Sequence, residues 1–249
     1  MEYGKACQLV LDECRQALGK VDEGQVKEFI SLVYSSEKVF FIGVGRVLLS
    51  LEAFAKRLAH LGIDAVVVGE ITEPAFTDKD LLVVGSGSGE SLFPVAIAKK
   101  AKSIGGKVVH IGSNENSSMK EVTDLMVRIP VRTKLYKEDE ISSEQPMSSL
   151  FEQALLLFGD SVSKMIVEEK QIELKQLWKF HANPRIPRLK LFTNISKPGF
   201  TFPSNAVSIF FNNHEDNGPI IIAPLNIVTS EPTITPIVVN APITPPLCP

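Results

Sequence analysis

The sequence lacks the cysteine patterns of disulfide-rich and metal-binding proteins. Its 249 residues include only three cysteines, Cys7, Cys14 and Cys248, and no two of them form a CxxC pair. This sparse spacing excludes a disulfide framework and a cysteine-based metal cluster. We therefore expect no metal, and a reducing, cytoplasmic location.

The sequence also lacks an excess of either charge and a long apolar run. Lys and Arg number 26 against 29 Asp and Glu, a net charge of −3, and no basic run is dense enough to contact a nucleic-acid backbone. Charged residues come too early in the N-terminal segment for a signal peptide, and the longest apolar run, residues 218–228, is broken by Pro219 and Pro224. Neither nucleic acid nor a membrane is expected as a partner.

Proline and charge are distributed unevenly along the chain. Residues 184–249 hold 12 of the 16 prolines but only seven charged side chains, whereas residues 1–183 hold four prolines and 48 charged side chains. Prolines every few residues remove the backbone donors that extended strand pairing needs. We expect a globular domain over 1–183 and a disordered or loosely packed tail over 184–249. The alternatives are a small β appendage, containing the strand-like segments 207–211 and 220–223, and a fused foreign peptide.

Within the first 183 residues, short apolar runs alternate with segments of helical periodicity. Continuous apolar runs closed by glycine are typical of strands buried on both faces, and they occupy 38–43, 64–69, 80–85, 107–112 and 124–130. Apolar residues recur at helical spacing over 3–19, 22–34, 48–60, 93–104 and 147–169, and a last short helix is expected over 171–181. The pattern predicts an α/β fold with a five-stranded parallel sheet covered by helices on both faces.

A glycine- and serine-rich segment, VVGSGSGES at 83–91, runs from the third predicted strand into a helix. Its glycines let the backbone turn tightly and approach a ligand, and its serine hydroxyls stand beside the free amides of a helix N-terminus. Such a loop suits an anion. The lysine of the GxxxxGK[ST] motif is absent, so a nucleotide triphosphate is not expected. The alternative is an ordinary turn between strand and helix.

The first predicted strand ends in GVGR at 43–46. Leu48 stands where the dinucleotide-binding motif GxGxxG has its third glycine, so we expect no nicotinamide cofactor. Arg46 follows the carboxyl end of a central strand, where a guanidinium is placed to bond a phosphate or a sugar hydroxyl. A surface arginine in the first turn of a helix is the alternative.

Glu152 and His181 are the candidates for acid–base chemistry. Glu152 lies among apolar residues near the start of a predicted helix, where a partly buried carboxylate suits proton abstraction. Taken alone it is more simply a helix-surface residue, and Glu144 and Glu70 are competing carboxylates. His181, in KFHAN, is an acid–base candidate near neutral pH or a solvated helix end. His60 is most simply a helix end.

Taken together, these motifs carry a resemblance to a known family. GVGR, AFAKRLAHLG, VVVGE, SGSGES, AKKAKSIG, QPMSSLFEQ and HAN occur in the order and spacing of the sugar isomerase (SIS) domain, and they are most similar to the 6-phospho-3-hexuloisomerases. The likeness extends from about residue 3 to residue 183. It implies a three-layer α/β/α sandwich of flavodoxin-like type with a five-stranded parallel sheet. It also implies a homotetramer with active sites between subunits, and no cofactor.

The resemblance further implies a reaction and a set of site residues. The substrate would be D-arabino-3-hexulose 6-phosphate, converted through a cis-enediol to fructose 6-phosphate in the ribulose monophosphate route of formaldehyde fixation. Glu152 would be the catalytic base, and His181 would have a supporting role at a neighbouring site. The substrate would contact two loops, whose residues are Gly45, Arg46, Val47, Ser86, Gly87, Ser88, Gly89, Glu90 and Ser91.

The sequence departs from the family at Val47, where the GxGRSG pattern has a serine. An apolar side chain cannot bond a phosphate oxygen, and losing such a bond costs about 1.5–3 kcal/mol. A second departure follows Asn183, where the family reads HANLE and this chain continues with Pro184. The alternatives are therefore a SIS protein that binds a sugar phosphate for regulation, and an aldose–ketose isomerase similar to arabinose 5-phosphate isomerase.

Overall fold

In the computed structural model, which describes residues 1–135, 137–180, 190–191, 207–210 and 224–225, the chain divides into two compact units, Met1–His181 and Ala182–Pro249. The first unit contains a five-stranded sheet in the order β2-β1-β3-β4-β5, in which every neighbouring pair is parallel. Its strands are β1 (Val39–Ile42), β2 (Ala65–Val67), β3 (Leu81–Gly85), β4 (Lys107–Gly112) and β5 (Leu125–Arg128). The predicted fold class is confirmed.

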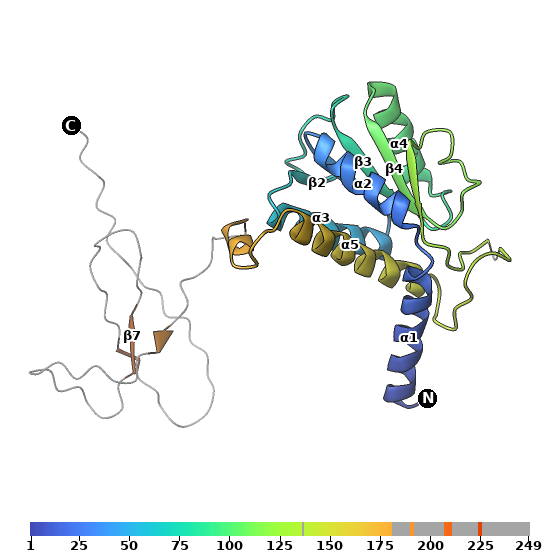
Figure 1. The fold of residues 1–249 in the computed structure, drawn as a ribbon. Helices are drawn as coiled ribbons and strands as arrows, with labels where there is room; N and C mark the ends of the chain where they lie inside the picture. Colours follow the sequence, from blue (N-terminus) through green and yellow to red (C-terminus); the bar gives the residue numbers. More distant parts are fainter. Residues whose placement is uncertain (136, 181–189, 192–206, 211–223, 226–249) are drawn as a thin grey trace, which may run out of the picture. The chain divides into compact units, whose positions relative to one another are not determined.

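Helices cover both faces of this sheet (Figure 1). The helices are α1 (Tyr3–Leu18), α2 (Glu23–Ser35), α3 (Arg46–His60), α4 (Leu92–Ile104) and α5 (Ser149–Glu169). The bounds of all five agree with the predicted segments to within two residues. The predicted helix over 171–181 is instead a short 3-10 helix, Gln176–Phe180. Gln171 adopts a left-handed backbone conformation, with φ 51°, which ends the helical path of α5 before this segment.

Alternate residues of β1, β2, β3 and β4 enter two separate cores. Val39 and Phe41 of β1 face the core formed with α1, α2, α3 and α5, whereas Phe40 and Ile42 face the core formed with α4. Burial on both sides explains why the strands are continuous apolar runs with no polar alternation.

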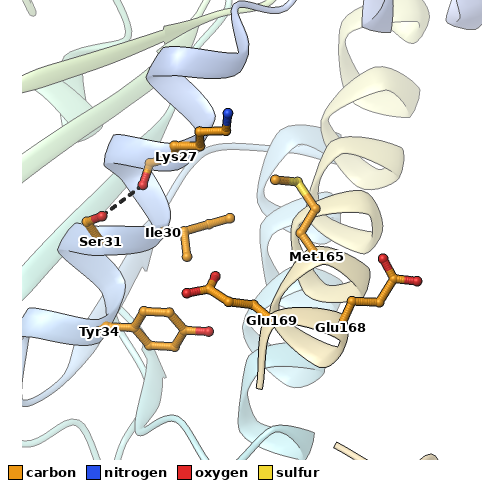
Figure 2. A pocket seen from close by; sticks show the side chains of 7 residues that line it. All are labelled: Lys27, Ile30, Ser31, Tyr34, Met165, Glu168 and Glu169. Carbon is orange, nitrogen blue, oxygen red and sulfur yellow. Dashed lines mark hydrogen bonds between the residues drawn. The ribbon is translucent and has the colours of Figure 1, made fainter. Parts of the chain in front are cut away.

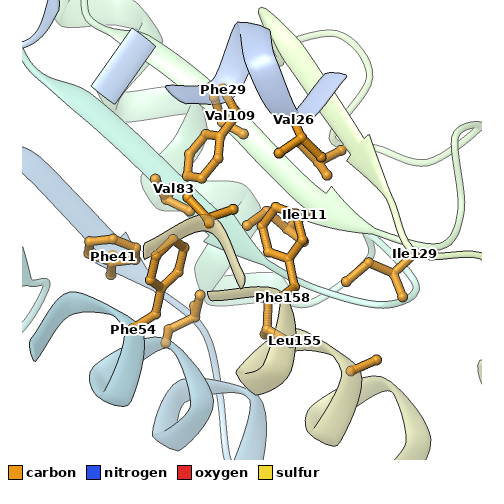
Figure 3. Packing of buried hydrophobic residues seen from close by; sticks show 14 of the residues in the cluster. Val26, Phe29, Phe41, Phe54, Val83, Val109, Ile111, Ile129, Leu155 and Phe158 are labelled. Carbon is orange, nitrogen blue, oxygen red and sulfur yellow. The ribbon is translucent and has the colours of Figure 1, made fainter. Parts of the chain in front are cut away.

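A cluster of four phenylalanines fills the larger core (Figure 3). One comes from each of α2, β1, α3 and α5: Phe29, Phe41, Phe54 and Phe158. The ring of Phe54 lies 6.0 Å from that of Phe29 and 5.5 Å from that of Phe41, both in edge-to-face geometry. Aromatic pairs at these separations add attraction beyond the area that they bury. The cluster therefore fixes α3 and α5 against the sheet.

Helix α1 is fastened to the segment that precedes α5. The carboxylate of Glu13 accepts hydrogen bonds from Ser143 Oγ at 2.6 Å, from the Glu144 amide at 2.8 Å and from Gln145 Nε2 at 2.9 Å. Burial tends to raise the pKa of the Glu13 carboxyl, but these bonds and the positive charge of Arg132 outweigh it and hold the pKa below its usual value. The ionised side chain therefore stabilises the folded state.

The second unit contains a three-stranded antiparallel sheet in the order β6-β7-β8. Its strands are Lys190–Leu191, Val207–Phe210 and Pro224–Leu225. The segment predicted as strand-like at 207–211 thus forms a strand over four of its five residues. The segment 220–223 lies outside the described residues, as does most of the stretch for which a disordered or loose tail was predicted, so that expectation stays a prediction.

We expect Gly159→Ala to destabilise the protein, although alanine normally favours a helix over glycine. A Cβ at Gly159 would lie 2.6 Å from Cγ of Phe54, and overpacking of this kind costs about 1–3 kcal/mol. Gly4 in α1 is the matched control, since a Cβ there has no atom within 4 Å and alanine should be neutral or stabilising. Chemical unfolding of both variants measures the difference, and equal stability would show that α3 and α5 adjust.

We expect Glu13→Gln to lower the free energy of unfolding by about 1–3 kcal/mol at neutral pH. Because the pKa of Glu13 is lower in the folded state, its contribution is present above its ordinary value of 4.5 and is lost as pH falls through the folded-state pKa. The difference in free energy of unfolding between wild type and variant, measured with urea from pH 7 downwards, should therefore become smaller below about pH 4.5. Asp12→Asn, in an exposed pair with Arg15, should change little at any pH.

Candidate functional site

Two loops at the carboxyl edge of the sheet leave toward opposite faces. Strand β1 continues into α3, whose buried residues belong to the larger core, and β3 continues into α4, whose buried residues belong to the other core. Because β1 and β3 are neighbours in the order 2-1-3-4-5, this is the topological switch point of the sheet. Open α/β sheets bind ligands at this position. It is where GVGR and SGSGES, the two loops singled out in the sequence, begin.

Glu152 is a buried residue at this edge and not a helix-surface glutamate. It lies in the first turn of α5 and is 8% exposed. Ser148 Oγ donates to Oε1 of its carboxylate at 2.9 Å, and Ser50 Oγ of α3 donates to its backbone carbonyl at 2.8 Å. These bonds fix both the side chain and the backbone of the residue predicted to be the base.

Arg46 supplies the charge that faces this carboxylate. It begins α3, directly after Gly45, whose φ of 58° favours glycine. Its Nε donates to Oε2 of Glu152 in an ion pair, while 65% of the Arg46 side chain remains exposed. A cation at a helix N-terminus opposes the helix dipole, and the carboxylate of Glu152 compensates for it.

The beginnings of α3 and α5 meet the loop that follows β3. A Cβ at Gly85 would lie 2.9 Å from Cγ1 of Val47, so the Val47 side chain packs against the end of β3. A Cβ at Gly87 would lie 3.5 Å from the ring of Phe151, the residue before Glu152. The structure therefore brings Arg46, Val47 and the first part of the glycine- and serine-rich loop together around Glu152.

The serines of this loop bond largely to the loop itself. Gly89 N donates to Ser86 Oγ at 3.1 Å, Glu90 N donates to Ser88 Oγ at 3.3 Å, and Ser86 and Ser91 join through their hydroxyls at 3.3 Å. Gly89 has a φ of 70°, and a Cβ there would collide with the side chain of Ser117. The loop is thus held in one conformation by its own hydroxyls.

Glu90 does not point toward the other predicted site residues. Its carboxylate accepts bonds from the amide and the hydroxyl of Ser118, at 2.9 and 2.6 Å. These bonds, together with the charge of Lys134, hold the pKa of Glu90 below its usual value. Glu90 therefore fastens the loop to the segment after β4.

Several polar residues around the loop were not identified from the sequence. The segment after β4 supports it: Asn114 Nδ2 donates to the carbonyl of Ser88 at 3.0 Å, and Lys137 Nζ donates to Oδ1 of Asn114. Glu140, which is buried, accepts from the amide and the hydroxyl of Thr133, each at 3.0 Å. These residues lie in irregular segments without a motif, so no sequence pattern could have indicated them. For Ser148, its spacing of four residues from Glu152 on a helix was an available signal.

The remaining candidates do not join this cluster. His181 lies outside the described residues, and its role stays a prediction. His60 is the last residue of α3, at the opposite end of that helix from Arg46, as expected for a helix end. Glu70 and Glu144, the competing carboxylates, are exposed.

A cavity of about 480 Å³ lies elsewhere, between α2 and the C-terminal end of α5 (Figure 2). Burial, together with the negative charge of Glu169, raises the pKa of the Tyr34 hydroxyl that borders it. The other lining residues are Lys27, Ile30, Ser31, Met165 and Glu168. This cavity contains none of the predicted site residues.

The described part of the chain shows neither a group of metal ligands nor a membrane-spanning helix. Within the part of the chain that the structure describes, no three His, Cys, Asp or Glu side chains are grouped to hold a metal ion. Of the helices in the same part, none has the length and apolar character needed to span a bilayer.

Comparison with known proteins identifies relatives that match about 70% of this chain. A 3-hexulose-6-phosphate isomerase of Bacillus subtilis is 36% identical over 174 residues, which are 70% of this chain and 94% of that protein. A protein of the same name from Mycobacterium gastri is 35% identical over 175 residues, 70% of this chain and 87% of that one. The chain thus spans nearly the full length of both.

A solved structure and a family match agree with these relatives. The crystal structure of a Methanococcus jannaschii protein, for which a molecular function of 3-hexulose-6-phosphate isomerase is inferred, has a TM-score of 0.63 and 29% identity. The match covers 73% of this chain and 99% of that one. The SIS domain matches residues 32–157, which include both loops and Glu152. The chain belongs to the SIS domain family.

Proposed function

We propose that the protein interconverts D-arabino-3-hexulose 6-phosphate and fructose 6-phosphate, a reaction of the ribulose monophosphate route. The relatives named 3-hexulose-6-phosphate isomerase support a phosphosugar isomerase role. The observation that carries the specific proposal is the buried carboxylate of Glu152, fixed by Ser148 and paired with Arg46 at the switch point of the sheet. Residues 1–183 form the isomerase domain in this proposal.

The chemistry requires one base and no redox partner. Glu152 takes the proton from C2 of the 3-hexulose, the electrons of that C–H bond form the C2=C3 double bond of a cis-enediol, and the C3 carbonyl oxygen gains a proton. The C2 hydroxyl then loses its proton to become the carbonyl, and Glu152 returns a proton to C3. A positioned carboxylate contributes on the order of 10²–10⁴-fold to such a step.

The phosphate group binds away from the reacting carbons and positions them. Arg46 and the loop from Ser86 to Ser91 are the proposed phosphate and hydroxyl ligands. Loop amides near the N-terminus of α4 suit an anion, and binding energy from a remote group is converted into orientation at the reacting centre.

The homotetramer expected from the resemblance, with active sites between subunits and His181 reaching a neighbouring site, remains part of the proposal. On α5, Leu156, Leu157 and Met165 are each about two-fifths exposed. These are apolar groups that an assembly would cover.

A second candidate function is the binding of a sugar phosphate for regulation without turnover. Val47 favours it, because its side chain packs against Gly85 and offers no hydroxyl to a phosphate oxygen. Thermal-shift binding of fructose 6-phosphate without product formation would support this alternative. An aldose–ketose isomerase, the other alternative, would exchange a hydrogen at a different carbon of the sugar from the proposed isomerase.

Glu152→Gln should abolish isomerisation while leaving substrate binding. In deuterated water, the wild-type protein is expected to produce the 3-hexulose from fructose 6-phosphate and to incorporate deuterium at C3 of the fructose, whereas an aldose–ketose isomerase would label C1. The variant should be at least about 100-fold slower with an unchanged thermal shift. Glu144→Gln and Glu70→Gln are the controls and should retain the rate. No exchange by folded wild-type protein would disprove the isomerase proposal, and full activity of Glu152→Gln would remove Glu152 from the base role.

Val47→Ser and Val47→Thr should lower KM for fructose 6-phosphate by about tenfold or more, because each adds a hydroxyl that can bond the phosphate. Threonine also keeps a methyl group of the kind that contacts Gly85. Val47→Ala separates the two effects, since it loses the methyl groups without gaining a hydroxyl and should not lower KM. An unchanged KM in both hydroxyl variants would place the phosphate elsewhere.

A further inference from the structure

The contact between Arg46 and Glu152 poses a question for the proposed mechanism. Within the described part of the chain, Glu152 is the only side chain that bonds to the Arg46 guanidinium, through Nε and Oε2. The same carboxylate accepts from Ser148 Oγ at Oε1. Each oxygen of the proposed base therefore already accepts a hydrogen bond, one of them from a cation. While this ion pair is intact, the guanidinium therefore blocks Oε2 from accepting a proton of the substrate.

The side chains of the two partners in this ion pair differ in how freely they can move. The side chain of Glu152 is 10% exposed, whereas that of Arg46 is 65% exposed. Ser148 and the packing of α5 hold the carboxylate in place, but the long arginine side chain extends from the first residue of α3 into solvent. When the pair separates, Arg46 is therefore the partner that moves. Solvent around the exposed guanidinium screens its attraction to the carboxylate, which lowers the cost of separating the pair.

A phosphate dianion competes strongly for the same guanidinium. It carries more charge than a carboxylate and accepts two parallel bonds from the arginine fork. Val47 makes the phosphate more dependent on Arg46, because the hydroxyl that the family pattern places after the arginine is absent here and the phosphate has one fewer alternative donor.

We propose that Arg46 is a switch that the substrate operates: its guanidinium covers Oε2 of Glu152 until the phosphate of the substrate draws it away, and this transfer uncovers the base. The inference rests on the proposed function and adds regulation of the same site by the substrate phosphate. Ser148 keeps its bond to Oε1 throughout and holds the carboxylate in orientation. The protein is thereby protected from abstracting protons from sugars that carry no phosphate.

The test divides the substrate into two pieces, D-fructose and inorganic phosphate. With wild-type protein, deuterium exchange at C3 of D-fructose should be slow, and added inorganic phosphate should accelerate it about two- to fivefold. With Arg46→Gln, exchange of D-fructose alone should rise about two- to fivefold above wild type, and phosphate should no longer accelerate it. The same variant should lose at least tenfold in kcat/KM for fructose 6-phosphate.

Arg57→Gln is the matched control. Arg57 is also an arginine of α3 paired with a carboxylate of α5, through Nε and Asp160 Oδ1 at 3.2 Å, and both partners are half exposed. It should behave as wild type in all three assays. The switch is overturned if phosphate accelerates Arg46→Gln as much as wild type, or if Arg46→Gln slows D-fructose and fructose 6-phosphate by the same factor.

A second readout does not depend on turnover. The ¹⁵Nε signal of Arg46, assigned by its loss in Arg46→Gln, should shift on addition of inorganic phosphate, and Glu152→Gln should shift it without any phosphate. If wild-type protein exchanges no hydrogen of fructose 6-phosphate, the isomerase proposal fails, and this signal still decides whether phosphate draws Arg46 from Glu152. An Arg46 signal that phosphate does not move overturns the inference.

Discussion

The close packing of α5 against α3 determines where the candidate site is formed. Gly159 lets the two helices approach over Phe54, whose ring belongs to the phenylalanine cluster between these helices and the sheet. One helix carries Glu152 and the other begins with Arg46. Any change in the separation of the helices would therefore also change the distance between the carboxylate and the guanidinium. Core packing and the chemistry of the site depend on the same contact.

The hydrogen bonds around Glu152 add to the positioning that this helix packing provides. Ser50 joins α3 to the backbone of Glu152, Ser148 orients its carboxylate, and Glu13 fastens the segment immediately before α5. A functional carboxylate held by hydrogen-bonded neighbours keeps its geometry at little entropic cost during a reaction. Arg46 is the exception, since most of its side chain is in solvent. The site thus combines a fixed base with a movable cation.

The sequence was sufficient to predict those parts of the fold that depend on local periodicity. Strands such as β3 and β4 were continuous apolar runs because both of their faces are buried, and the helices showed spacing that matches their buried stripes. The short 3-10 helix was not predicted, because a single left-handed residue, Gln171, changes the path of a segment whose composition favours a helix. For the site, the spacing of motifs identified Arg46 and Glu152 separately. Their ion pair joins residues 106 positions apart, and the supports around Asn114 and Glu140 lie in irregular loops, so no local pattern could reveal either.

The bond between Glu13 and Ser143 has a consequence for how the chain reaches its native state. The two residues are 130 positions apart, so α1 cannot complete its contacts until the segment before α5 has been synthesised. Contacts of such long sequence separation form late, because a large loop must close first. Until then, the face of α1 that is buried in the folded protein, which includes Cys14 and Ala17, is exposed to solvent. Docking of α1 would therefore be a late step of folding. The same contacts fix the segment that leads into α5, the helix that carries Glu152.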